Sequence, residues 1–305
     1  MKLFYLKLPL FLFLATGSLF AQDTQIRSRE LQQQVLPGLG EGAAEYEEDG
    51  EFGKILTLKR AKPWYIIPYA SARGYWTSNV LLTNIDEESD EIFVDTQGLT
   101  AGYRITKDWR VQAGYSYQLT RYHDKVFLDT NAHNVEFGST YGLPWDFQLG
   151  GGVRGLWLNE AHQLELEIYK ETNPYGSLMR SQSFLDDRLN WFYGYQFDQK
   201  YASPRNFDRI EHTLFTGISY AWMPNLLSQL VFRQNWQFYD FRAPSAFPKA
   251  REEWISSVAL QTVWQPFPWL QVSAFGLATY DNSVNAARDY DAANLGGEVR
   301  FFWKF

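Results

Sequence analysis

The sequence predicts an all-β fold: a transmembrane antiparallel up-and-down β-barrel of about 12 strands, within a range of about 10 to 14. Aromatic residues make up 18% of the 305 residues although the mean hydropathy is −0.36, so apolar rings are plentiful while long apolar runs are rare. From residue 64 onward, apolar and polar side chains alternate with a period of two, which separates them onto the two faces of extended strands. The chain also ends on an alternating, aromatic segment of this kind.

Residues 1–21 are predicted to be a cleaved signal peptide. Lys2 and Lys7 precede an apolar stretch, Leu8 to Leu14, that is too short to span a bilayer. Small residues follow this stretch, and cleavage is expected after Ala21. The alternative is an uncleaved membrane anchor, which needs about 20 apolar residues, and the polar residues after Ala21 disfavour it.

Residues 22–62 are predicted to form a flexible periplasmic N-terminal arm. A short helical stretch, Asp23 to Val35, is followed by glycines and then by an acidic run from Glu45 to Glu51, and none of these would bury a core. A partner-binding tail is the alternative. The net charge of the whole chain is −7, so nucleic acid is not an expected partner. Because the chain has no cysteine, disulfides and thiolate metal sites are excluded.

The barrel domain is predicted over residues 63–305. In residues 226–241 the apolar and polar side chains fall on opposite faces: Leu230, Phe232, Trp236 and Phe238 against Gln229, Arg233, Asn235 and Gln237. The pattern recurs, with varying quality, in segments 64–79, 92–105, 109–122, 134–143, 147–158, 163–171, 189–201, 210–222, 226–241, 254–265, 270–281 and 294–305. An even strand number suits a closed barrel with both termini on one side. Residues 170–187 are ambiguous, so the count is open by about two strands.

The links between these segments alternate in length. Short links lie at residues 106–108, 144–146, 223–225 and 266–268. Longer polar links lie at residues 84–90, 124–131, 244–250 and 282–289. In a barrel of this class the short turns face the periplasm and the long loops face outward. Two aromatic girdles are expected at the membrane interfaces, one beside the short turns (Trp109, Trp145, Trp222, Trp264 and Trp269) and one towards the long loops (Trp76, Tyr122, Trp157, Tyr201 and Tyr280).

The C-terminus carries apolar or aromatic side chains at every second position: Val299, Phe301, Trp303 and Phe305. This stretch resembles the signal that the barrel-assembly machinery reads in Gram-negative outer-membrane proteins. The resemblance implies an outer-membrane location, with the assembly machinery, membrane lipid and lipopolysaccharide as partners. Residues 68–118, with the run Gly74 to Val80, also look like the opening hairpins of β-barrel porins, some of which are associated with exopolysaccharide systems.

No catalytic, cofactor-binding or metal-binding motif stands out in the sequence, and the chain is not expected to be an enzyme. Outer-membrane phospholipases place a Ser two residues after a His, but the residues at that offset from the four histidines are Lys125, Val135, Leu164 and Leu214. Two pairs of neighbours, His123–Asp124 and Asp186–Asp187, are of the kind that outer-membrane proteases use to activate water, and solvated loop charges are the favoured alternative. An acidic loop at residues 86–90 has the ligand type of a calcium site, again with a solvated loop favoured.

Charged residues of both signs fall on the face predicted to point into the barrel. The candidate lumen-lining residues are Arg73, Arg104, Arg110, Glu136, Arg154, Glu165, Glu167, Asp198, Lys200, Glu211, Arg233, Asp281, Glu298 and Arg300. A barrel of about 12 strands should have a narrow lumen, so these charges either line a small passage or pair and close it. The functional hypothesis is a porin-like channel or export-associated pore for hydrophilic solutes or polysaccharide. A structural or adhesive surface barrel without a pore is the alternative, and a barrel lipase or protease is less favoured.

Overall fold

A computed structural model describes residues 25, 27, 63–84, 86–162, 166–240, 251–284 and 288–305. The predicted signal peptide, its cleavage site, the acidic run and most of the N-terminal arm lie outside these residues and stay predictions. Gln25 and Arg27 are helical. Within the described ranges, no helix is long and apolar enough to cross a membrane.

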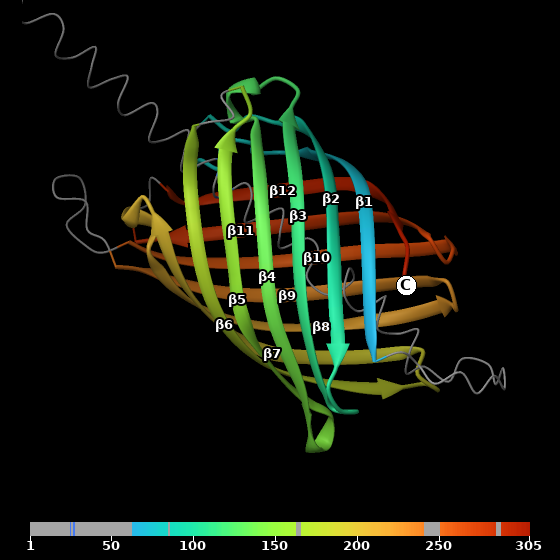
Figure 1. Cartoon of the computed structure of the whole chain (residues 1–305). Helices are drawn as coiled ribbons and strands as arrows, with labels where there is room; N and C mark the ends of the chain where they lie inside the picture. Colours follow the sequence, from blue (N-terminus) through green and yellow to red (C-terminus); the bar gives the residue numbers. More distant parts are fainter. Residues whose placement is uncertain are drawn as a thin grey trace, which may run out of the picture.

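Twelve β-strands in the described part of the chain follow one another and close into a single barrel (Figure 1). Each strand pairs antiparallel with its neighbours in sequence, and the last strand pairs with the first. Three short 3-10 helices lie in the connections: η1 (Val126–Leu128), η2 (Pro144–Asp146) and η3 (Arg205–Phe207). The strands are β1 (Trp64–Thr77), β2 (Asp90–Arg104), β3 (Trp109–Tyr122), β4 (Thr130–Leu143), β5 (Phe147–Glu160), β6 (Glu167–Phe184), β7 (Leu189–Ser203), β8 (Arg209–Met223), β9 (Leu226–Tyr239), β10 (Glu252–Phe267), β11 (Leu270–Ser283) and β12 (Tyr290–Phe302).

The predicted fold class and strand number are confirmed, and the largest difference from the predicted segments lies in β6. The sequence predicts a strand over residues 163–171, whereas β6 is a strand of 18 residues that continues through the ambiguous segment. Its face opposite the buried Tyr169 and Glu171 carries Lys170 and Pro174 instead of an apolar row, so the alternation is weak. Because Pro174 has no N–H to donate, it also interrupts the ladder between β6 and β7.

The two ends of the barrel differ in their connections. At one end, the short-turn end, the strands are joined at residues 105–108, 144–146, 185–188, 224–225 and 268–269. At the other, the long-loop end, they are joined at residues 78–89, 123–129, 161–166, 204–208, 240–251 and 284–289. The predicted alternation of short and long links is therefore present, with one short turn, at residues 185–188, that the sequence did not predict. In that turn Leu185, Asp186 and Asp187 all have positive φ.

The C-terminal strand closes the barrel against β1. Its register places Phe302 opposite Tyr69. Beyond the end of β12, the Phe305 N–H donates to the Ile66 carbonyl at 3.1 Å, and the Ile66 N–H donates back to the Phe305 carbonyl at 3.4 Å. An open sheet edge would leave such groups unpaired in a membrane, so this pairing supplies the partners that closure requires.

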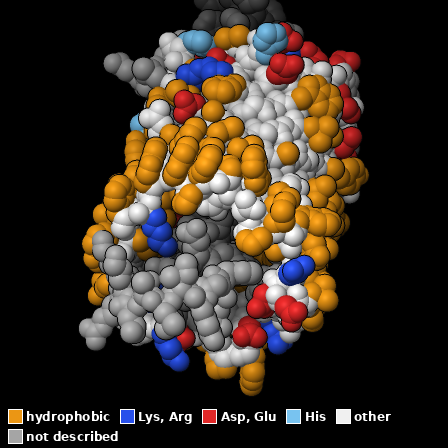
Figure 2. Space-filling model, turned by 90° about the vertical axis from the view of Figure 1, so that its right-hand side faces the viewer, with side chains coloured by type: hydrophobic (Ala, Val, Ile, Leu, Met, Phe, Trp, Pro, Cys, Tyr) orange, Lys and Arg blue, Asp and Glu red, His pale blue; other side chains and the backbone are white. Residues whose placement is uncertain are grey.

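The outer wall of the barrel is apolar. In β9, Leu230 and Phe232 are 43% and 45% exposed, while Val231 between them is 8% exposed and faces the interior. This confirms the faces predicted for residues 226–241. Figure 2 shows hydrophobic side chains spread over the wall. Exposed apolar surface of this extent is suited to a hydrocarbon surrounding.

Aromatic side chains lie on the outer face near both ends of the strands. The indole N–H groups of Trp109, Trp191 and Trp222 donate to side-chain hydroxyls on the next strand, at 2.8, 3.0 and 2.9 Å. These bonds satisfy polar atoms that face outward. Nine of the ten predicted girdle residues lie on the outer face or in a turn.

Tyr122 is the exception, and its assignment to a girdle is wrong. It is 5% exposed and packs inside the barrel with Val94 and Leu128. The reason is the pleat of β3, in which Tyr122 shares its face with Arg110, and not with the outward Trp109.

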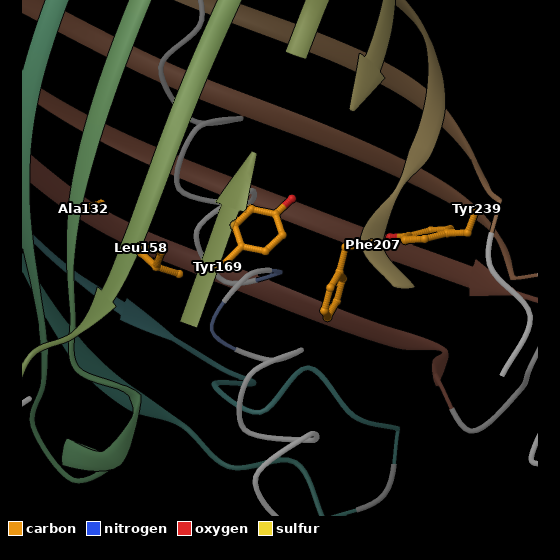
Figure 3. Close-up of a cluster of buried hydrophobic side chains, with 5 residues drawn as sticks. All are labelled: Ala132, Leu158, Tyr169, Phe207 and Tyr239. Carbon is orange, nitrogen blue, oxygen red and sulfur yellow. The ribbon is translucent and has the colours of Figure 1, made fainter. Parts of the chain in front are cut away.

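Hydrophobic side chains fill the barrel interior near the long-loop end. One cluster joins Ala132, Leu158, Tyr169, Phe207 and Tyr239 from five different elements (Figure 3). Two further clusters consist of Val80, Ile92, Val94, Tyr122 and Leu128, and of Leu82, Tyr290 and Ala292. Towards the short turns, inward residues such as Arg110 and Gln148 stay partly or fully accessible. Among the described residues, these three apolar clusters thus lie in the long-loop half, and accessible inward residues lie in the short-turn half beside buried ones such as Ile67 and Val263.

Candidate functional site

The lumen is the candidate site, and the strand faces place most of the predicted residues in it. The inward residues are Arg73, Arg104, Arg110, Glu136, Arg154, Asp198, Lys200, Glu211, Arg233, Asp281, Glu298 and Arg300. Glu165 lies outside the described residues. Glu167 is exposed at the first position of β6, beside a register shift at the long-loop rim, and so it does not line the interior. A bulge reverses the face that simple alternation assigns to a residue beyond it.

Several inward charges pair with charges on the adjacent strand or on the next strand but one. Arg73 and Glu298 are direct neighbours on β1 and β12, and the Arg73 Nη2 to Glu298 Oε2 distance is 3.1 Å. Arg154 on β5 lies between two carboxylates, with its Nε 3.4 Å from Glu136 Oε1 and its Nη1 3.6 Å from Asp198 Oδ1. Both members of the Arg73–Glu298 pair are buried, so this ion pair acts in a medium of low dielectric constant. These ion pairs link strands of the barrel wall to one another.

Further inward residues, which the sequence did not identify, bind these or other inward carboxylates. The Asn173 amide donates to Asp198 Oδ1 at 3.0 Å, and the Tyr175 hydroxyl donates to Glu136 Oε1 at 2.8 Å. Arg209, which is 1% exposed, donates from Nε to Glu211 at 2.5 Å. The signal for Arg209 was available, because it lies two residues before Glu211 and therefore on the same face. Asn173 and Tyr175 fell in the ambiguous segment that became β6.

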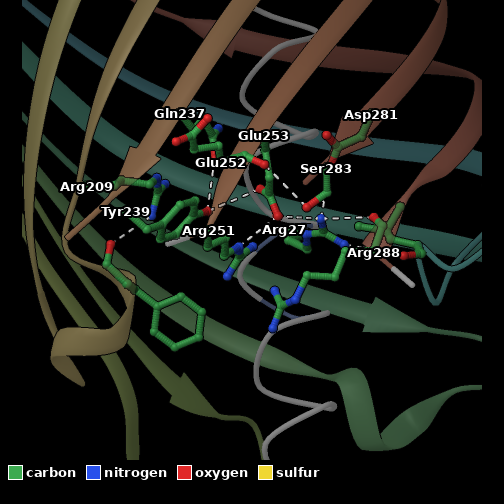
Figure 4. A network of polar contacts seen from close by, with 12 residues as sticks. Arg27, Arg209, Gln237, Tyr239, Arg251, Glu252, Glu253, Asp281, Ser283 and Arg288 are labelled. Atoms are coloured by element: carbon green, nitrogen blue, oxygen red, sulfur yellow. Dashed lines mark hydrogen bonds and ion pairs between the residues drawn. The ribbon is translucent and has the colours of Figure 1, made fainter. Parts of the chain in front are cut away.

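The long-loop half holds a denser cluster around two buried carboxylates, Glu253 on β10 and Asp281 on β11. Glu253 accepts from Arg251 Nε at 2.7 Å and from the Tyr239 hydroxyl at 3.3 Å. Arg27 reaches both carboxylates, with Nη2 2.9 Å from Glu253 Oε1 and 2.8 Å from Asp281 Oδ2 (Figure 4). The sequence predicted a flexible periplasmic arm around Arg27. The structure places this residue inside the barrel, where it is 7% exposed, and the arm over residues 22–62 stays a prediction.

Several arginines point into the short-turn half of the lumen. Arg104 and Arg110 lie opposite each other on β2 and β3 and are half-buried. The Arg300 guanidinium carbon lies 4.3 Å from the centre of the Tyr69 ring. That ring lies over Gly98 of β2, where the Cβ of any other residue would overlap it. By contrast, the inward carboxylates of the described strands lie nearer the middle or the long-loop end, and most of them are buried.

Two acidic residues of the loop considered as a calcium site, Glu88 and Asp90, bind other groups of the protein. The Asp90 carboxylate accepts the backbone N–H groups of Glu91, Asp124 and Lys125 at 2.7, 3.0 and 3.0 Å. Lys125 pairs with Glu88, and that hydrogen bond raises the pKa of the lysine. Across the described ranges, no group of three or more acidic, His or Cys side chains is arranged to hold a metal ion.

The residue pairs considered as catalytic lie at opposite ends of the barrel. His123 Nε2 is 4.0 Å from Asp124 Oδ1 at the long-loop end, and the two side chains are 74% and 70% exposed. Asp186 and Asp187 lie in a tight turn at the short-turn end. The structure therefore does not bring the two pairs together.

The closed, all-antiparallel barrel with an apolar wall and a polar interior has the fold of outer-membrane β-barrel proteins. No protein-family model and no curated protein matches the sequence. Among solved structures, the chain is similar to an outer-membrane channel from Pseudomonas putida F1, with 10% identity, 80% of this chain and 97% of that chain covered, and a TM-score of 0.50. It is also similar to the translocator domain of autotransporter NalP from Neisseria meningitidis, with 10% identity, 93% and 98% covered, and a TM-score of 0.47.

Proposed function

We propose that this protein is an outer-membrane channel that passes hydrophilic and preferentially anionic solutes, including acidic oligosaccharides or segments of polysaccharide. The short-turn half of the lumen, lined by Tyr69, Arg104, Arg110 and Arg300, is its entry vestibule. Outer-membrane lipid, lipopolysaccharide and the barrel-assembly machinery are its proposed partners, and a cleaved signal peptide is its proposed route of export. No catalytic step is part of this proposal.

The observation that carries the proposal is the unequal accessibility of the inward charges. In the long-loop half, Glu253 and Asp281 are 1% and 0% exposed and engaged by arginines. In the vestibule, Arg104, Arg110 and Arg300 are only half-buried. A passing solute therefore meets positive charge, and apolar walls strengthen its field within the lumen.

The vestibule also suits a carbohydrate more than a simple ion. Tyr69 and Tyr65 lie over glycines of β2. The Arg300 guanidinium carbon is 4.3 Å from the centre of the Tyr69 ring, and Lys304 Nζ is 5.9 Å from the centre of the Tyr65 ring. Aromatic faces combined with a few placed polar groups are typical of sites for organic ligands. These two tyrosines and their neighbouring cations would offer ring faces for stacking and positive charge to an extended acidic sugar chain.

A non-conducting structural or adhesive barrel is the second candidate. The observation that favours it is the packed interior of the long-loop half, where side chains such as Leu158 and Leu128 are 0% exposed. If that half stays closed, a solute that enters the vestibule cannot cross the barrel. The two candidates therefore differ in whether the barrel conducts.

Planar-bilayer recording of the purified protein separates them. The channel proposal predicts discrete conductance steps from the wild-type protein or, if the long-loop half is closed, from the Arg27→Gln variant. Both proteins are first checked for the heat-modifiable gel mobility of a folded barrel. If both are folded and neither gives steps over the accessible voltage range, the channel proposal fails and the structural candidate stands.

A further inference from the structure

Two described residues that precede the barrel lie within its long-loop end. Gln25 and Arg27 are each 7% exposed, although β1 begins only at Trp64. Pro63 is at the opposite, short-turn end, where its carbonyl accepts the Arg104 N–H at 2.6 Å. Gln25 and Arg27 are therefore held far from the point at which the chain enters the barrel wall.

Arg27 is bound by the two buried carboxylates described above. Its Nη2 lies 2.9 Å from Glu253 and 2.8 Å from Asp281, and its guanidinium carbon is 5.0 Å from the centre of the Tyr290 ring. If Arg27 leaves, Glu253 keeps its bond from Arg251, whereas Asp281 loses the cation bound to it, and such a loss strongly destabilises a buried carboxylate. The site is therefore shaped for a guanidinium (Figure 4).

The same two residues contact connections spread around the long-loop rim. The Gln25 amide donates to the Phe127 carbonyl at 3.0 Å, in the link between β3 and β4. Arg27 donates to the carbonyls of Leu82 at 3.4 Å and Arg288 at 3.3 Å, in the links on either side of the β1–β12 seam. With β10 and β11 holding the guanidinium, the contacts join well-separated parts of the barrel circumference.

We propose that Gln25 and Arg27 form a latch that closes the long-loop end of the lumen, and that release of Arg27 from Glu253 and Asp281 opens it. The latch regulates the channel proposed above, so its role in conduction rests on that function. Whether Arg27 can be released from the two carboxylates does not depend on the proposed channel function. The opposing interpretation is a permanent brace that stays in place whether or not Arg27 keeps its charge.

A thiol reporter tests the latch directly, because the chain has no cysteine of its own. A Gln25→Cys variant is folded in liposomes and labelled with a membrane-impermeant maleimide, once with Arg27 intact and once with Arg27→Gln. The latch predicts that Arg27→Gln raises the labelling rate about tenfold or more, since it favours local opening over the protected state. His123→Cys, at a side chain that is 74% exposed, gives the rate of a fully accessible thiol.

The matched control is Arg205→Gln, which removes an exposed arginine at the same end of the barrel and should leave the reporter thiol of Gln25→Cys protected. Arg27→Lys should give slower labelling than Arg27→Gln, because a lysine retains the charge. Arg27 belongs to no strand, so every variant is expected to fold, and gel mobility verifies it. Equal labelling of the reporter thiol with Arg27 and with Arg27→Gln in folded barrels would overturn the latch.

The outcomes also separate the latch from the channel. If Arg27→Gln exposes the reporter thiol but neither protein conducts, the latch stands and the channel proposal fails. If the wild-type protein conducts and the reporter thiol is equally protected in both backgrounds, the channel stands and the latch is refuted.

Discussion

At the scale of single residues, the pleat of each strand decides whether a side chain meets lipid or the lumen. Phe232 points outward and Val231 points inward although they are adjacent, since successive side chains lie on opposite faces. An outward arginine near the middle of the membrane costs about 2 to 4 kcal/mol, whereas a lumen-facing one can remain hydrated.

Phe232→Arg should therefore impair membrane folding far more than Val231→Arg. The fraction of heat-modifiable protein after refolding into lipid measures this. Equal folding of the two variants would show that the faces of β9 are assigned wrongly.

A second residue-scale prediction concerns Glu211. Its Oε1 lies 2.5 Å from Arg209 Nε and 2.8 Å from Lys200 Nζ, and all three side chains are largely shielded from solvent. Glu211→Ala leaves two shielded cations without their carboxylate, so the free energy of unfolding should fall by about 3 to 5 kcal/mol. Urea unfolding followed by gel mobility measures the loss. Glu167→Ala, at the exposed rim, is the control and should change little, and a similar effect of both would contradict the assigned role.

Which residues face the lumen could be predicted from the sequence, but their partners could not. Alternation alone places Arg73, Arg154 and Glu298 inward, because it needs only the period of a strand. The pairing of Arg154 with Asp198 bridges β5 and β7, and it depends on register and on side-chain reach across β6. Those are properties of the closed sheet, and no local pattern encodes them.

At the scale of elements, the pairing at the end of the last strand should matter for assembly of the barrel. Phe305 is paired through its backbone with Ile66, whereas a chain terminus is ordinarily frayed and tolerant of loss. Its 63% exposed ring lies at the short-turn end. The terminal residue should thus matter for closure and for the proposed assembly signal.

Deleting Phe305 should leave export to the periplasm intact but sharply lower the amount of heat-modifiable, membrane-inserted protein. Phe305→Tyr keeps an aromatic ring and the backbone pairing and serves as the control. Gel mobility with and without boiling, on separated membrane and periplasmic fractions, reports both quantities. Insertion of the truncated protein at the wild-type level would show that the terminal signal does not operate here.

The elements that the sequence did not predict share a physical reason. β6 is a strand because its neighbours β5 and β7 need partners on both sides, although Lys170 and Pro174 weaken its own pattern. Arg27 is placed by Glu253 and Asp281, more than 200 positions away in the sequence. In both cases tertiary contacts override the local composition, which pattern reading cannot detect.

At the scale of the whole molecule, the barrel divides its charge between its two ends. Carboxylates are buried against arginines towards the long loops, and half-buried arginines remain towards the short turns. In the proposed channel, the first arrangement closes the lumen and the second gives its entry a positive potential. Together the two proposals describe a gated, anion-preferring passage.

The reversal potential across a KCl gradient tests this central claim most directly, measured on conducting barrels in the Arg27→Gln background. The account predicts anion selectivity, and a shift towards cations when Arg300→Glu is added, because a charge in a narrow lumen acts at short range. Arg205→Glu, the same charge change at an exposed loop, should leave the reversal potential in place. Cation selectivity of the starting protein, or an unchanged reversal potential with Arg300→Glu, would contradict the account.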